Sequence, residues 1–166
     1  MPRHHQPVAC RLDQREHFLI WFSDDEGKDG VVLTPERQLL CTASEAALRE
    51  RARSLGITFV GELSSYDLDA VEAWTRTRDP DAIDCKLLLD AWNWLGDVTS
   101  SLRSRADLFV AADAKLNKVY DKLFHGNNLP AVTAPREHYE PTWSASEASD
   151  LAALLRLGLQ LFRAAR

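Results

Sequence analysis

Several features that would place this chain in a particular class are scarce or missing. It has only three cysteines among 166 residues, Cys10, Cys41 and Cys85, and none of them forms a CxxC pair. An odd, widely spaced set favours free thiols in a reducing compartment. No apolar run approaches the ~18 residues of a membrane-spanning helix, and the N-terminus lacks the apolar segment of a signal peptide. We therefore expect a cytoplasmic protein with no membrane partner.

The motifs that most often mark an enzyme are also missing. The sequence contains no GxSxG, GxGxxG, Walker or HExxH motif. Paired acids such as Asp67 and Asp69 stand where helices are expected to begin, so helix capping explains them without acid–base chemistry. Four acids crowd residues 24–29, but they lack the ligand spacing of an EF-hand loop. We predict a non-catalytic protein without a cofactor or a metal.

What the chain does have is the composition of an ordinary globular domain. Hydrophobic residues make up 45% and charged residues 27%. A chain of this length buries roughly 70% of its extended surface, so it needs neither a disulfide nor a metal to fold. No repeat or low-complexity tract divides it. We predict a single globular domain over residues 1–166, with 1–9 as a flexible tail.

The N-terminal third has β-type composition interrupted by one helix. Strands are predicted at residues 17–23, 31–34, 37–41 and 57–60. The first of these is aromatic and β-branched with little polarity, which indicates an interior strand. A capping box at 42–45, with Thr42 as the N-cap, predicts a helix that ends at Gly56. These elements predict a small mixed or antiparallel sheet.

The rest of the chain has helical periodicity. Helices are predicted at 67–76, 82–103, 112–124 and from Ser144 to the C-terminus, where a second capping box begins. The most regular is 82–103, whose apolar face includes Trp94 and predicts the central packing helix. Gly158, on the apolar side of the last helix, indicates close approach to another helix. The fold class is therefore α+β, a small sheet packed by about five helices.

Negative charge is concentrated in the middle of the chain. The net charge is −5, and residues 62–97 hold nine acids against three bases. This argues against nucleic acid as a direct ligand and favours a basic protein partner, although a solvated surface explains the same pattern. On the helix at 82–103, Asp90, Asn93 and Asp97 form one polar edge beside Trp92. Acids next to an aromatic ring are suited to contacting a basic protein surface.

Three segments resemble a known family. The sequence LLDAWNWLGDVTSSL at 88–102 resembles a helix of small bacterial immunity proteins, which partner polymorphic toxins, including those of contact-dependent growth inhibition systems. YDKLFHGNNLP at 120–130 and YEPTW at 139–143 are similar as well. The resemblance covers roughly the C-terminal half. It implies a non-catalytic, cytoplasmic protein that binds one toxin domain tightly, but it nominates no interface, because toxin-facing residues vary in this family.

We therefore expect the chain to bind and neutralise a cognate toxin domain, one that is basic and nuclease-like, through an acidic surface. Charge and expected exposure nominate the following partner-binding residues: Asp24, Asp25, Glu26, Asp67, Asp69 and Asp90. The alternative is a small-molecule-binding or regulatory domain. Its pocket would lie near a helix end, among His125, Asn127, Asn128 and His138.

Overall fold

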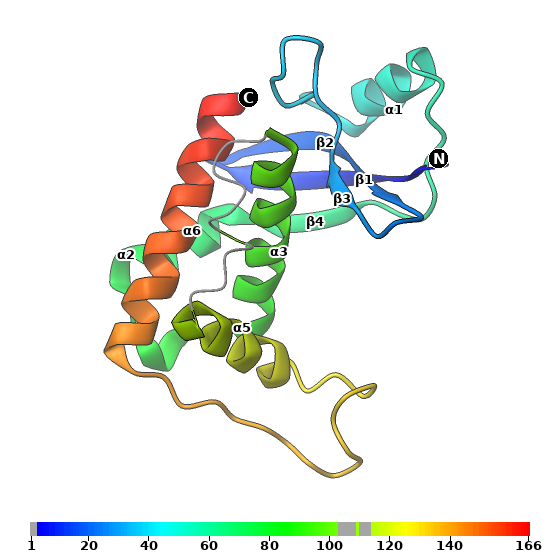
Figure 1. Cartoon of the computed structure of the whole chain (residues 1–166). Helices are drawn as coiled ribbons and strands as arrows, with labels where there is room; N and C mark the ends of the chain where they lie inside the picture. The colour runs from blue at the N-terminus through cyan, green and yellow to red at the C-terminus, as the bar shows by residue number, and fades with distance from the viewer. Residues whose placement is uncertain (1–2, 103–108, 110–113) are drawn as a thin grey trace.

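The structure, a computed structural model, describes residues 3–102, 109 and 114–166 and has the predicted α+β architecture. Its strands are β1 (Arg3–Leu12), β2 (Arg15–Asp24), β3 (Asp29–Val31) and β4 (Ser64–Asp67). The helices described are α1 (Glu45–Ser54), α2 (Leu68–Thr77), α3 (Cys85–Leu102), α5 (Ala114–Gly126) and α6 (Ala145–Ala165), with a 3-10 turn at Pro80–Ala82. Figure 1 shows α3 crossing the strands, with α6 alongside it.

The four strands form one mixed sheet in the order β3-β2-β1-β4. β2 is interior, as predicted, and β1 pairs with it antiparallel and with β4 in parallel. The prediction of a flexible tail at 1–9 is wrong, because Arg3–Leu12 is a full strand. Its apolar residues lie in its second half, where Val8, Cys10 and Leu12 alternate into the large core and Ala9 is also buried. The polar residues before them concealed the strand.

The remaining strand predictions hold in part. Residues 57–60 are not a strand, since only an isolated bridge joins Phe59 to β1. The fourth strand is β4 instead, and its sequence SSYD has low β-propensity, so pairing with β1 makes it extended. The predicted return of 37–41 on 31–34 is present as a short hairpin, where Leu33 bridges Leu39. Of this hairpin, only Val31 belongs to the sheet, as the last residue of β3.

Both faces of the sheet are covered. In β2, Leu19 and Trp21 face the large core with α2, α3 and α6, whereas Phe18 and Ile20 face a smaller cluster with Leu48 of α1. The alternation follows from the two-residue period of a strand. A strand buried on both faces needs an almost continuous apolar sequence, as β2 has.

The helix ends follow local sequence signals with one exception. The N-cap of α1 is Ser44, whose hydroxyl accepts the N–H of Ala47, and not Thr42. Thr42 cannot serve because its backbone pairs with Phe18 as an isolated bridge. Gly56 has φ +69° just after α1, as predicted for a left-handed cap. The second capping box, which begins α6, is also present.

The predicted central helix is α3. Its Leu88, Trp94, Leu95 and Val98 are buried in the large core. Against it lies α6, where a Cβ added to Gly158 would come within 3.0 Å of the Leu95 Cβ, so the predicted close approach is confirmed. The predicted end of the central helix at residue 103 and the predicted start of the helix at 112–124 lie outside the described residues.

Candidate functional site

The six acids predicted to bind a partner fall into two groups. Asp24, Asp25 and Glu26 lie in the turn between β2 and β3, where Asp24 Oδ1 accepts the N–H groups of Glu26 and Lys28. Asp24 pairs in register with Arg3, at the start of β1, whereas Asp67 lies beside the other end of that strand. The two groups are therefore about 26 Å apart along the strand. The structure does not bring the six together.

The carboxylates of Asp67 and Asp69 at the start of α2 have structural roles. Asp67 caps α2 by accepting the N–H of Ala70 at 2.9 Å. Asp69 accepts the N–H groups of Asp13 at 2.7 Å and Gln14 at 2.9 Å, in the turn between β1 and β2. Both turn residues have positive φ, and the paired hydrogen bonds hold them there. Helix capping was anticipated for both acids and holds for Asp67, whereas Asp69 binds the turn between β1 and β2.

Asp90 lies close to Asp67. The two line one hollow of about 280 Å³ together with Asp84 and Tyr66. Lys86, one turn before Asp90 on α3, pairs with its carboxylate at 2.5 Å. This ion pair offsets part of the negative charge that the hollow would otherwise present.

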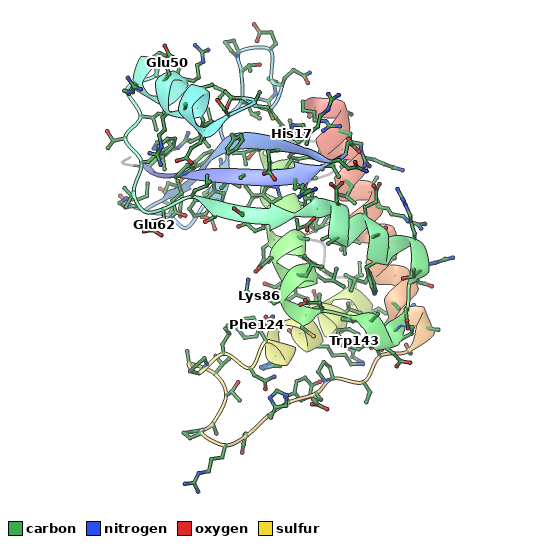
Figure 2. The ribbon with its side chains drawn as sticks, turned by 180° about the vertical axis from the view of Figure 1, so that it is seen from behind. His17, Glu50, Glu62, Lys86, Phe124 and Trp143 are labelled. Atoms are coloured by element: carbon green, nitrogen blue, oxygen red, sulfur yellow. The ribbon has the colours of Figure 1, made fainter. Side chains whose placement is uncertain are left out.

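The region of the alternative pocket uses its amides to hold the backbone. Asn128 donates to the carbonyl of Tyr139 at 3.0 Å and accepts its N–H at 2.7 Å, and Asn127 donates to the Leu123 carbonyl at 2.9 Å. These bonds fasten the long loop that projects between Phe124 and Trp143 in Figure 2. The imidazoles of His125 and His138 are exposed.

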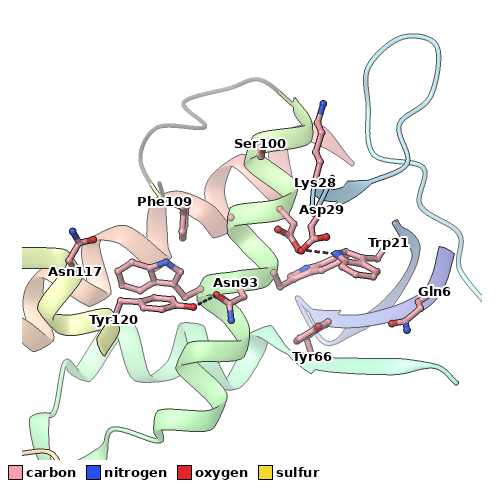
Figure 3. A pocket seen from close by; sticks show the side chains of 15 residues that line it. Gln6, Trp21, Lys28, Asp29, Tyr66, Asn93, Ser100, Phe109, Asn117 and Tyr120 are labelled. Carbon is pink, nitrogen blue, oxygen red and sulfur yellow. Dashed lines mark hydrogen bonds between the residues drawn. The ribbon is translucent and has the colours of Figure 1, made fainter. Parts of the chain in front are cut away.

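A large hollow lies elsewhere, in a groove of about 820 Å³ where the sheet meets α3 and α5 (Figure 3). Its lining includes six aromatic side chains from four elements and residue 109: Trp21, Tyr66, Trp92, Trp94, Phe109 and Tyr120. Asp29 and Asp97 supply carboxylates. We name this feature the aromatic groove. Its size and its mixture of rings with a few polar groups are typical of a binding site.

The rings of the aromatic groove are ordered by contact with one another. Tyr66 stacks on Trp94 with centroids 5.2 Å apart and planes 14° apart. Trp92 meets Tyr120 edge to face at 5.3 Å. The Tyr120 hydroxyl donates to Oδ1 of Asn93 at 3.1 Å, which ties α5 to α3. Such pairs stabilise the rings in place before anything binds.

Asp97 carries the most perturbed carboxyl in the groove. Burial raises its pKa to about 6, the hydrogen bond from Trp21 opposes this, and repulsion by Asp29 adds to it. Trp21 Nε1 donates to Oδ2 at 2.8 Å, while Oδ1 has no hydrogen-bond partner among the described residues. At neutral pH the Asp97 carboxylate therefore places a half-buried negative charge in the groove, and its Oδ1 can accept a further hydrogen bond.

Close packing of β3 on α3 sets the position of Asp97. The hydroxyl of Ser101 accepts the N–H of Val31 and donates to the Asp97 carbonyl, both at 2.8 Å. A Cβ on Gly30 would come within 2.5 Å of that hydroxyl oxygen, so the approach requires glycine. Val31 is in turn the register partner of Trp21. The pairing of β2 with β3 and the packing of β3 on α3 thus bring the Trp21 indole next to the Asp97 carboxylate.

The sequence alone pointed to part of this site. It singled out the edge formed by Asp90, Asn93 and Asp97 beside Trp92, and the structure places Asn93, Asp97 and Trp92 in the aromatic groove. Asp90 lies in the neighbouring hollow. Trp21 was missed as a site residue, because its partner is 76 residues away and nothing local signals the pairing.

Comparisons with known proteins give a fold and nothing finer. No family model matches the chain, and no curated protein matches it. It is similar to the crystal structure of the SatS C-terminal domain in complex with bromine, with a TM-score of 0.62 and 14% identity. The match covers 97% of this chain and 91% of that chain. Identity this low shows a shared fold only, so the resemblance to immunity proteins stays a prediction.

Three further observations concern the described part of the chain. None of its helices combines the length and apolar character needed to cross a bilayer. Within residues 3–102, 109 and 114–166, no group of three or more His, Cys, Asp or Glu side chains is placed to hold a metal ion. The three cysteines are free thiols.

Proposed function

We propose that the chain is a non-catalytic protein-binding domain that captures a basic partner protein, in the way an immunity protein neutralises its toxin. The aromatic groove is the observation that supports this most strongly. It combines ordered rings with a half-buried carboxylate that keeps a free oxygen. Aromatic residues carry much of the energy at protein interfaces, and complementary charge selects the partner.

The surface around the groove continues into a second hollow. Tyr66 lines both the aromatic groove and the hollow that contains Asp67, Asp84 and Asp90, so the two depressions adjoin. A stable interface needs about 800 Å² on each partner, more than one groove supplies. A basic partner would therefore cover both depressions, with the groove at the centre.

The test is direct binding to the product of the neighbouring gene, which in a toxin–immunity pair encodes the partner. Both proteins are purified separately and titrated by calorimetry at low and high salt. We expect a dissociation constant of about 1 μM or tighter at low salt, weakening as salt screens the charges. Absence of binding at low salt would contradict the toxin-neutralising role.

A further inference from the structure

The aromatic groove holds two carboxylates without a matching cation. Asp29 is near enough to Asp97 to raise the pKa of Asp97 by repulsion between the two carboxylates. Within the described residues, neither carboxylate forms an ion pair. Lys28 also lines the groove, but Figure 3 shows its side chain pointing away from Trp21 and Asp29. A cation supplied by a partner would relieve the repulsion.

The hydrogen-bond geometry favours a planar, forked cation over a compact one. Trp21 already occupies Oδ2 of Asp97, which orients the carboxylate and leaves Oδ1 without a hydrogen-bond partner among the described residues. Tyr66, whose one face is covered by Trp94, also lines the groove beside this carboxylate. A guanidinium both bridges carboxylates and stacks on rings, whereas an ammonium acts as a point charge.

The volume of the groove has room for more than one side chain. At about 820 Å³ the groove is near the upper end of the ~300–1,000 Å³ range of sites that enclose whole ligands. A single arginine side chain would leave much of it empty. A short stretch of chain on either side of the arginine would contact the remaining rings, among them Trp92 and Tyr120.

We infer that the aromatic groove binds a short segment of the partner protein by holding one of its arginine guanidinium groups against Asp97 and Asp29. This inference rests on the proposed function and names the chemistry that its site recognises. Trp21 acts as a positioning residue, because its indole N–H orients the Asp97 carboxylate. Asp29, at the exposed rim, supplies the second carboxylate.

The test uses two capped tripeptides, glycine–arginine–glycine and its citrulline counterpart, which keeps the shape of arginine and removes its charge. The indole N–H of Trp21 reports binding in a ¹H–¹⁵N NMR spectrum, where Trp21→Phe identifies its signal among those of five tryptophans. We expect the arginine peptide to shift that signal and to bind about tenfold more tightly than the citrulline peptide, as charge-assisted hydrogen bonds would give.

Three variants locate the contact. Asp97→Asn keeps an oxygen for Trp21 and should weaken the arginine peptide about tenfold. Asp29→Asn, at an exposed position that leaves the fold intact, should weaken it severalfold. Asp25→Asn, on the exposed turn between β2 and β3, is the matched control and should change nothing.

Equal binding of the two peptides would overturn the inference, as would full arginine affinity in both Asp97→Asn and Asp29→Asn. The outcomes separate it from the proposed function. If the neighbouring gene product binds these variants as tightly as the wild type, the protein-binding role stands and arginine recognition fails. If the peptide binds but that protein does not, arginine recognition stands and the toxin-neutralising role fails.

Discussion

Asp97 is expected to destabilise the fold at neutral pH, and replacing it should show this. Its pKa is about 6 in the folded protein instead of 3.8, chiefly because burial removes water from the carboxylate. Between these two values the folded protein keeps a proton that the unfolded chain has released. Stability therefore falls as pH rises from about 4 to 6 and stays lower above that range.

The magnitude follows from the same two values. A pKa raised from 3.8 to about 6 corresponds to about 3 kcal/mol, and solvent screening of this partly exposed group reduces it to about 1–2 kcal/mol. Asp97→Asn removes the charge and keeps an acceptor for the Trp21 indole N–H. We expect the variant to gain about 1–2 kcal/mol at pH 7.5, and the gain to vanish at about pH 4, where Asp97 is protonated in the folded protein.

Urea unfolding followed by far-UV circular dichroism at both pH values measures the gain. Asp25→Asn serves as the control, since this exposed turn carboxylate should leave stability within about 0.5 kcal/mol at either pH. Lower stability of Asp97→Asn at pH 7.5 would refute the reasoning, as would an equal gain at pH 4. A residue that weakens the fold while serving a binding site is a common compromise between stability and function.

Two predictions concern the scaffold. Gly158→Ala should lower the free energy of unfolding by about 1–2 kcal/mol, because the new methyl group meets the buried Leu95. Gly96→Ala is its helical control: its Cβ meets ordinary contacts at 3.5 Å or more, so unfolding by heat should show no loss. Asp69→Ala should cost about 1 kcal/mol in the same measurement by removing the acceptor for the N–H groups of 13–14. An unchanged melting temperature for Gly158→Ala or Asp69→Ala would contradict these packing and turn assignments.

The helices were predictable because each carries its own signal. The periodicity of α3 and the capping box of α6 are local patterns, and their placement holds to within a few residues. Thr42 shows the limit of such patterns. It has the right spacing for an N-cap, but a bridge to Phe18 commits its backbone and moves the cap to Ser44.

The strands were harder because pairing partners decide them. β1 begins with residues as polar as a tail, yet it is extended because it pairs with β2 along its whole length. β4 has no β-branched residue and is extended because it pairs with β1. The candidate site was only partly predictable for the same reason. Asp97 was visible as one edge of a helix, but only the folded sheet places Trp21 against it.

The measurement closest to the central claim compares two variants in binding the product of the neighbouring gene. Asp97→Asn changes the aromatic groove, and Asp25→Asn changes the acidic turn that charge alone nominated. The groove-based account predicts an affinity loss of about tenfold or more for Asp97→Asn and none for Asp25→Asn. The opposite result, a loss for Asp25→Asn alone, would move the interface to the turn and contradict the account.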